Sequence, residues 1–278
     1  MNVVIADIRQ NVIDDILPIF SENGWSVFGI KLNVLNRDEY AKAVDTAEAH
    51  FGNIHLLVNN AGISCANGPL WEVSPAETDL AVDVNLIGVL NGVQTVVPRM
   101  LKHGEVGHVV STASKAALLP VPRCGLYNMT KQAVVGMMET LAMDLEETGI
   151  GVSVFCPGGY QTNLRTSSND VKAELLGDSY QLAPPLQSNS GSAPARNGYD
   201  EVIRSADDAG ERVVRGVKRG DLYILTHSEF KNGVDSRFNA ILRAFPDEIP
   251  NPRYSEVLPM LTYNAIFDKQ SEVPALKK

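Results

Sequence analysis

The sequence predicts an α/β protein built on one doubly wound parallel sheet in three layers, with a C-terminal extension. Short runs rich in β-branched residues alternate with helical stretches from residue 3 to 155, as in a parallel sheet covered by helices on both faces. The chain has 278 residues, enough for one large core without disulfides or metals. We therefore expect a single domain over residues 1–278.

Six strands are expected from the runs of β-branched and apolar residues. They cover residues 3–7, 25–32, 55–59, 108–112, 152–155 and 222–226. Each of the first five ends in polar or small residues. Because strand ends of a parallel sheet point toward the ligand crevice, residues just beyond them are candidates for binding and catalysis.

The helices between these strands carry recognisable start signals. Asn36 precedes a helix to about residue 50, and Ser74-Pro75-Ala76-Glu77 is typical of a capping box that opens a helix running to about residue 102. Further helices are expected at 206–218 and 228–245. Pro18 lies inside the first helical stretch and predicts a kink or an early end there.

After residue 155 the alternation of strands and helices fades. Residues 163–200 contain clusters of serine, proline and glycine, which are typical of loops and mobile segments. Because a helix and a strand follow, we interpret this stretch as a flexible insertion within one domain. The chain then divides into a core over 1–162, this loop, and an extension over 228–278 whose prolines after residue 245 predict a mostly irregular tail.

Charge and composition exclude several functional classes. The formal net charge is −9 and the pI is about 5.1, so nucleic acid and anionic membrane surfaces are not expected as partners. No apolar run reaches the roughly 18 to 20 residues of a membrane span. Met1 leads directly into the first strand without a signal peptide, which predicts a cytoplasmic protein.

The cysteines and histidines show no metal-binding pattern. Cys65, Cys124 and Cys156 lack CxxC spacing, and the five histidines lack HxH or HxxxH pairs. No metal site is therefore expected. An odd number of unpaired thiols is typical of reduced cysteines in a cytosolic protein.

Tyr127 and Lys131 form the first candidate catalytic pair. They stand four residues apart, so on a helix both project from one face, about one turn apart. A fixed ammonium near a phenol favours the phenolate and lowers its pKa toward the range of a general base. Such a pair also arises by chance. In a chain of this composition with eight tyrosines, the expected number of Tyr–Lys pairs at this spacing is roughly one third.

Four further elements add context, although each has a structural alternative. Ser114 lies just past the strand at 108–112, where its hydroxyl either holds a substrate oxygen or caps a turn. Asn59-Asn60-Ala61-Gly62 follows another strand, and its small residues let a flat ligand approach or simply make a turn. Asn85 is a polar residue in an apolar helix, either a satisfied core amide or a functional one. Pro157-Gly158-Gly159-Tyr160-Gln161-Thr162 opens the loop after the fifth strand.

In this order and spacing, these elements resemble the classical short-chain dehydrogenase/reductase family, over residues 1 to about 162 and more weakly around 222–226. The resemblance implies a Rossmann-like fold and roles for four catalytic residues. Tyr127 would be the acid/base, Ser114 would position the substrate oxygen, and Lys131 would lower the tyrosine pKa and bind the nicotinamide ribose. Asn85 would hold a water in the proton relay.

The resemblance also implies a set of cofactor-binding residues and a preference for NAD over NADP. Asp7 closes the first strand beside the expected adenosine ribose, where a carboxylate repels a 2′-phosphate, although the nearby Arg9 could accommodate one. The family's usual Asp-Val pair at the adenine appears here as Asn33-Val34. The full expected cofactor set is Asp7, Ile8, Asn33, Val34, Asn60, Ala61, Gly62, Tyr127, Lys131, Pro157, Gly158, Tyr160 and Thr162.

One departure from the family pattern is large. The family begins with a strand and a Gly-rich turn that hold the pyrophosphate, whereas the first glycine here is Gly24 and no GxxxGxG occurs. In the strand order 3-2-1-4-5-6, the strand in question lies between those that carry Asp7 and Asn59. Either this is an N-terminally shortened version of a longer protein, or the sheet closes over the gap and cofactor binding suffers.

The leading hypothesis is an NAD-dependent oxidoreductase that interconverts a secondary alcohol and a ketone. The rival is a catalytically impaired derivative that serves as a binding or interaction protein. Leu, Pro, Tyr and Phe in the loop and the extension suggest an apolar or aromatic small-molecule substrate. Apolar residues on several faces of 86–102 and 127–147 predict a homodimer or homotetramer through these two helices.

Overall fold

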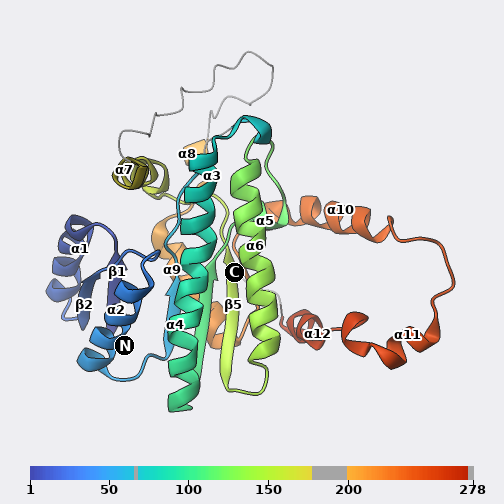
Figure 1. The fold of residues 1–278 in the computed structure, drawn as a ribbon, viewed down its shortest axis with the longest axis horizontal. Helices are drawn as coiled ribbons and strands as arrows, with labels where there is room; N and C mark the ends of the chain where they lie inside the picture. The colour runs from blue at the N-terminus through green and yellow to red at the C-terminus, as the bar shows by residue number, and fades with distance from the viewer. Residues whose placement is uncertain (66–67, 177–198, 275–278) are drawn as a thin grey trace.

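A computed structural model describes residues 1–65, 68–176 and 199–274 of the chain. It confirms the α/β class, with parallel strands and helices on both sides of them (Figure 1). The strands are β1 Val3–Asp7, β2 Val27–Lys31, β3 Leu56–Asn59, β4 Gly107–Thr112, β5 Ile150–Cys156 and β6 Tyr223–Leu225. All six predicted strands are present, and their ends differ from the predicted bounds by a few residues at most.

The helices fill the connections between the strands. The first half of the chain contains α1 Gln10–Glu22, α2 Arg37–Phe51, η1 Leu70–Glu72, α3 Pro75–Val82, the π-helical η2 Asp83–Ile87 and α4 Gly88–His103. The second half contains α5 Lys115–Leu118, α6 Gly125–Asp144, α7 Leu164–Leu176, α8 Tyr199–Val202, α9 Ala206–Arg219, η4 Ser228–Phe230, α10 Lys231–Leu242, α11 Pro252–Val257, η5 Pro259–Leu261 and α12 Ala265–Glu272.

The strands form two sheets rather than one. β1 pairs in parallel with β2, and β3-β4-β5-β6 form a separate four-stranded parallel sheet. No hydrogen-bonded pairing joins β1 to β3 within the described residues. The alternative in which the sheet closes over the gap is therefore not what the structure shows. The gap lies at the position expected from the order of the strands.

Two predicted helix starts are confirmed by their caps. The Asn36 side chain accepts hydrogen bonds from the backbone N–H groups of Asp38 and Glu39 at the start of α2. Ser74 accepts one from the N–H of Glu77, with Pro75 at the first helical position of α3. The helix that begins there continues through η2 and α4 to His103, close to the predicted end.

Three local predictions are wrong in whole or in part. Of the kink or early end predicted at Pro18, the early end does not occur, because α1 continues past this residue to Glu22 and loses only one N–H donor there. The segment predicted as a loop at 163–200 begins with a three-turn helix, α7, while residues 177–198 lie outside the described part of the chain. The tail contains α11, η5 and α12, and two of its prolines stand in the first turns of α11 and η5, where no N–H is needed.

The main core lies between the four-stranded sheet and the pair α4 and α6. Val96, Val97 and Met100 of α4 and Val134 and Met138 of α6 are buried against Val109 and Val154 of the sheet. Several apolar residues that suggested an oligomer interface are thus covered within one chain. Val93, Met137 and Leu141 are partly buried and lie at the border of this core.

The continuous helical stretch at 75–103 has the length and apolar composition of a membrane span. No such span was predicted from the sequence, because Asn, Gln and Gly interrupt its apolar residues. Of its most apolar window, 56% is buried inside the fold, where α4 packs against the sheet and α6. A core helix of an α/β protein has this composition because it is covered on more than one side.

Candidate active site

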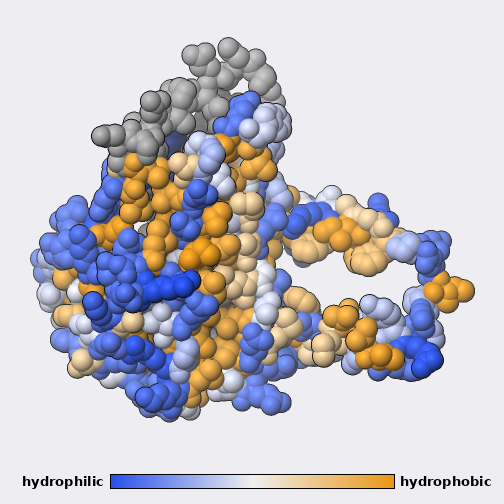
Figure 2. Space-filling view, viewed as in Figure 1, coloured by the Kyte–Doolittle hydropathy of each residue, from blue (hydrophilic) through white to orange (hydrophobic). Residues whose placement is uncertain are grey.

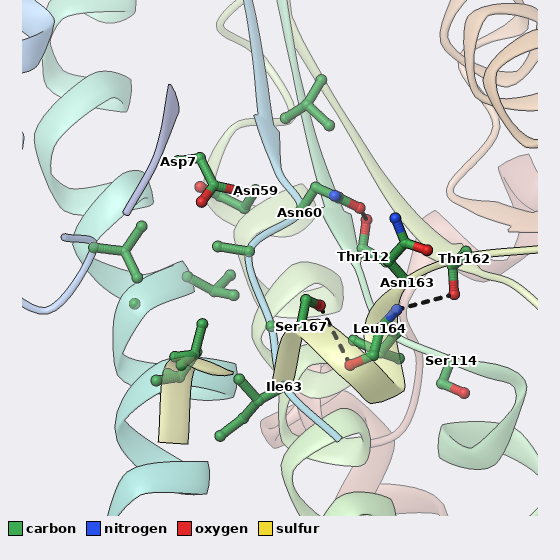
Figure 3. A pocket seen from close by; sticks show the side chains of 18 of the residues that line it. Asp7, Asn59, Asn60, Ile63, Thr112, Ser114, Thr162, Asn163, Leu164 and Ser167 are labelled. Atoms are coloured by element: carbon green, nitrogen blue, oxygen red, sulfur yellow. Dashed lines mark hydrogen bonds between the residues drawn. The ribbon is translucent and has the colours of Figure 1, made fainter. Parts of the chain in front are cut away.

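A cavity of about 740 Å³ lies at the carboxyl ends of the strands of both sheets. It runs from Asp7 at the end of β1 to Ser114 and Tyr127 beyond β4, with α7 along one side (Figure 3). Every predicted site residue except Asn85 lines this cavity. Residues from five strand ends and from α2, η2, α4, α6, α7 and α9 are therefore brought to one site.

Tyr127, Lys131 and Ser114 meet at one end of the cavity. Tyr127 and Lys131 lie on α6, and the Lys131 Nζ lies 5.8 Å from the centre of the Tyr127 ring. Ser114 follows β4 and shares a side-chain hydrogen bond with Tyr127. Ser114 also accepts a hydrogen bond from the N–H of Ala116, so the same residue that faces the site caps α5. The predicted cap is therefore present, and the same side chain also faces Tyr127 and the cavity.

Burial shapes the electrostatics of this group. Burial raises the pKa of Tyr127 above its ordinary value, and the hydrogen bond with Ser114 opposes this rise. Lys131 is 4% exposed, and burial lowers its pKa to about 8. Its Nζ donates a hydrogen bond of 2.9 Å to the carbonyl oxygen of Thr112, which fixes the ammonium between the sheet and the helix. The pKa of Tyr127 is therefore set mainly by burial, which raises it, and not by the charge of Lys131.

The turn at Gly62 lets the backbone approach this group. A Cβ at Gly62 would lie 3.1 Å from Asn85 Oδ1 and 3.4 Å from Lys131 Nζ, so a side chain there would crowd both. Asn85 accepts a hydrogen bond of 2.7 Å from the N–H of Ile63 and donates one of 3.0 Å to its carbonyl. The fully buried Asn85 lies in the π-helical turn η2, a distortion that is frequent at functional sites.

The other asparagines of the β3 turn hold neighbouring strands together. Asn59 donates a hydrogen bond of 3.2 Å to Ser111 Oγ across the sheet and is buried. Asn60 accepts one of 3.0 Å from Thr112 Oγ1, which Figure 3 shows at the edge of the cavity. Ala61 and Gly62, which follow these asparagines, line the cavity, as expected for residues that let a ligand approach the backbone.

The end of the cavity near β1 carries Asp7. Its Oδ1 accepts hydrogen bonds from the backbone N–H of Arg9 at 2.9 Å and from Arg9 Nε at 3.4 Å. Arg9 also lies 3.6 Å from Asp170 on α7, so it bridges the first strand and this helix. Asp7, expected to repel a 2′-phosphate, and Arg9, which could accommodate one, are thus in direct contact.

A buried amide that the sequence analysis missed supports the next strand end. Asn91 of α4 donates a hydrogen bond of 2.8 Å to the carbonyl of Val34 and accepts one of 3.0 Å from Arg37 Nε. This contact fixes the Asn33-Val34 turn that lines the cavity. The sequence signal was available, because Asn91 is polar in an otherwise apolar helical stretch, like Asn85.

The loop after β5 forms the wall opposite the β3 turn. Gly158 lies so close to His227 and Phe230 that a Cβ would be 2.4 Å from His227 Nδ1. Tyr160 donates a hydrogen bond of 2.8 Å to Asp208, and Thr162 accepts a weak one from the N–H of Leu164 at the start of α7. The predicted residues of this loop, Pro157, Gly158, Tyr160 and Thr162, all line the cavity.

The helix α7 is the largest part of the site that sequence reasoning missed. Lys172 forms a buried ion pair of 2.8 Å with Glu77, and Ser168 accepts a hydrogen bond of 2.8 Å from the N–H of Ser64. Val171 and Leu175 pack beside Ile63 and line the cavity. Apolar and small residues recur at helical spacing over 164–176, but the serine- and proline-rich segment after them hid this pattern.

Comparison with known proteins identifies the family to which this chain belongs. A model of the short chain dehydrogenase family matches residues 1–173 of the chain. The chain belongs to the short-chain dehydrogenase family. It is therefore an oxidoreductase, and family members act on small-molecule alcohols or ketones with a nicotinamide cofactor.

Individual relatives support this assignment. A C alpha-dehydrogenase from a Sphingobium strain is 31% identical over 241 residues, which cover 86% of this chain and 77% of that protein. A putative short-chain dehydrogenase from Novosphingobium aromaticivorans is 33% identical, with a TM-score of 0.75 over 98% of this chain and 87% of the other. A member from Burkholderia phymatum, solved in complex with NAD, is 32% identical, with a TM-score of 0.78 over 90% of this chain and 89% of the other.

Proposed function

We propose that the protein interconverts a secondary alcohol and a ketone, with Tyr127 exchanging the proton. The observation that carries this proposal is the meeting of Tyr127, Ser114 and Lys131 at one end of a cavity of about 740 Å³ that extends to Asp7. A phenol, a hydroxyl and a fixed ammonium at one point supply proton transfer and hydrogen bonding to a substrate oxygen.

Each residue has a distinct part in this scheme. The Ser114 hydroxyl binds the substrate oxygen, and the Tyr127 hydroxyl donates its proton to that oxygen during reduction and accepts it during oxidation. Lys131 provides a positive charge that stabilises the tyrosinate formed in reduction. When bound, the nicotinamide supplies or accepts the hydride.

For Asn85 we propose a positioning role for the side chain. Its amide bonds to both the N–H and the carbonyl of Ile63, and its Nδ2 also lies 3.3 Å from Thr130 Oγ1. The side chain is thus engaged by protein and fixes the turn next to Lys131. A relay water would then be held by backbone groups of this turn rather than by the amide of Asn85.

NAD is the preferred cofactor in this proposal. Asp7 stands at the end of β1, where its carboxylate would accept hydrogen bonds from the adenosine ribose and repel a 2′-phosphate. At the other end, Lys131 and the backbone of Pro157 and Gly158 suit the nicotinamide ribose and ring. Both ends thus fit a dinucleotide, whereas a Gly-rich turn for the pyrophosphate is absent from the residues that line the cavity.

The substrate is proposed to be an apolar or aromatic alcohol or ketone. Leu164, Val171 and Leu175 of α7 add apolar side chains to the cavity. A panel of secondary alcohols and ketones, assayed by the absorbance of NADH, tests the reaction class. Absence of turnover with the whole panel, although NADH binds, would contradict the proposal.

A second candidate function, a binding protein with impaired catalysis, is favoured by the gap between β1 and β3, which no strand pairing joins within the described residues. Titration with NADH while following thermal stability separates the two, because a ligand that binds only the folded state raises the melting temperature. A rise that saturates with NADH supports the enzyme, and its absence up to millimolar NADH supports the rival.

We further propose a homodimer or homotetramer through α4 and α6, and a cytoplasmic location.

A further inference from the structure

The C-terminal extension forms an arm that leaves the body of the protein and returns to it. Figure 1 shows α10 projecting away from the sheet and the chain turning back through α11 to α12. Every residue from 238 to 263 is exposed, a stretch that includes the end of α10, all of α11 and η5. We call residues 238–263 the arm.

Both ends of the arm are firmly attached. At its start, Gly233 packs closely against Leu119, and Arg237 donates a hydrogen bond of 3.1 Å to the carbonyl of Leu118. At its end, Ile266 is buried, and Gln270 Oε1 accepts hydrogen bonds of 2.6 and 3.2 Å from the N–H groups of Leu222 and Tyr223. The arm is therefore a built part of the fold rather than a loose tail.

The arm is unusually apolar for an exposed segment. Ile249 is 97% exposed and Met260 is 80% exposed, and Figure 2 shows apolar side chains along the arm on both sides of an open space. The large apolar residues exposed on it are Phe238, Ile241, Leu242, Phe245, Ile249, Tyr254, Val257, Leu258, Met260, Leu261 and Tyr263. A monomeric protein rarely exposes a contiguous apolar surface of this kind, which marks an interaction site.

We propose that the arm packs against a second copy of this chain and forms a homodimer interface separate from α4 and α6. Its length supports this, because a standard stable interface involves roughly 20 to 30 residues on each side. A twofold axis would place each arm against the other copy, so that the same apolar residues are covered in both. The inference concerns assembly and goes beyond the proposed catalytic function.

Charge favours a second copy over a membrane surface. The arm carries Arg243 and Arg253 against Asp247, Glu248 and Glu256, so it has both signs of charge and little net charge. Two such arms related by a twofold axis can pair arginine with carboxylate, although each whole chain carries −9. An anionic lipid surface would attract a basic arm instead, and this arm is not basic.

The test compares the full-length protein with an arm variant, Ile249→Ser, Met260→Ser and Leu261→Ser. These side chains contact little within one chain, so the fold of each copy is expected to persist, which far-ultraviolet circular dichroism checks. The control is Val106→Ser, an apolar residue that is 81% exposed outside the arm. Light scattering at about 20 µM measures the mass of each, against 30.1 kDa for one chain.

We expect the wild type and the control to have the same oligomeric mass and the arm variant to have half of it or less. Hydrogen exchange should also slow over 238–263 as wild-type concentration rises. A monomeric wild type, an arm variant with the wild-type mass, or protection of the arm that is independent of concentration would overturn the proposal. So would a monomer whose arm binds uncharged phosphatidylcholine vesicles. None of these results depends on whether the protein turns over an alcohol.

Discussion

The two ends of the cavity are built in different ways. At the catalytic end, Ser114, Tyr127 and Lys131 all come from the four-stranded sheet and the helices packed on it, where buried hydrogen bonds fix them. At the other end, Asp7 belongs to a separate two-stranded sheet, and Val58 in the facing strand β3 is 45% exposed.

Under the proposed function, the difference teaches that proton transfer and cofactor binding depend on different parts of the fold. The proposed acid/base pair, Tyr127 and Lys131, needs only local helical spacing and one continuous sheet. Cofactor binding needs the distance between two sheets to be fixed, and within the described residues no strand pairing fixes it. Side-chain contacts bridge the two parts instead: Arg9 with Asp170 of α7, Asn91 of α4 with Val34, and Arg99 of α4 with Glu48 of α2.

The largest effect is expected from Tyr127→Phe, which tests the catalytic end alone. Turnover should fall by about a hundredfold to ten-thousandfold, because the proton-transferring group is removed, while the dissociation constant of NADH stays nearly unchanged. Steady-state kinetics and NADH titration measure the two quantities. Tyr223→Phe is the matched control, because Tyr223 is a partly buried tyrosine that bonds to Glu139 and does not line the cavity. Retention of more than about a tenth of the turnover by Tyr127→Phe would refute the assignment.

The next effect concerns the other end of the cavity. A β-strand, Gly-rich turn and helix fused ahead of Met1 should pair with β1 and β3 and supply N–H donors to the cofactor pyrophosphate. Two charge-assisted hydrogen bonds at about 1.5 kcal/mol each would tighten NADH binding about a hundredfold. The melting temperature should rise as well, because a central strand buries β-branched side chains.

The control for this fusion is a glycine-serine segment of equal length ahead of Met1. It adds the same mass without a strand or a phosphate-binding turn. Isothermal titration with NADH and thermal denaturation compare the two fusions. Equal melting temperatures and equal dissociation constants would show that the gap between β1 and β3 does not limit cofactor binding.

A smaller effect is expected from pH through Lys131. Its pKa of about 8 lies below the ordinary value of 10.5, so between these values the unfolded chain holds a proton that the folded chain has released. The free energy of unfolding of the wild type should therefore rise, relative to Lys131→Met, as pH increases from 8 toward 10.5. At pH 9.5 the change is on the order of 2 kcal/mol. Urea denaturation of cofactor-free protein at pH 7.5 and 9.5 measures it, and a difference that does not change with pH would contradict burial of this ammonium.

The smallest effect is expected from Asp7→Ser, which sharpens the comparison at the adenosine end. Removal of a partly exposed carboxylate eliminates repulsion worth about 1 kcal/mol, so the preference for NAD over NADP should fall about fivefold. Arg9 remains to contact the 2′-phosphate. Binding of both cofactors is measured by titration, with Asp14→Ser on the exposed side of α1 as the control. An unchanged ratio would indicate that Asp7 does not select the cofactor.

Much of the site could be predicted because its parts are local. The spacing of Tyr127 and Lys131 places them on one face of a helix, and the residues after each strand end reach the cavity because parallel strands all end on the same edge. The caps at Asn36 and Ser74 were readable for the same reason, since a cap involves only neighbours within three residues.

The parts that were missed depend on contacts between distant segments. The ion pair of Lys172 with Glu77 and the hydrogen bond from Asn91 to Val34 each join residues more than fifty positions apart. Burial of Tyr127 is of the same kind, because the desolvation that raises its pKa comes from packing around it. A local pattern can mark Asn91 as a polar residue in an apolar helix, but it does not identify the distant partner or the packing around a side chain.

The sequence by itself determined the α/β class, the order of its strands, the shared helix face of Tyr127 and Lys131 and the position of the gap, because periodicity, caps and spacing act over a few residues. Only the tertiary structure decided that the gap stays open, that α7 closes one side of the cavity, and that the arm stands free of the body. These outcomes depend on which apolar surfaces pack against each other. The free energy of that packing is a sum over many residues that lie far apart in the chain.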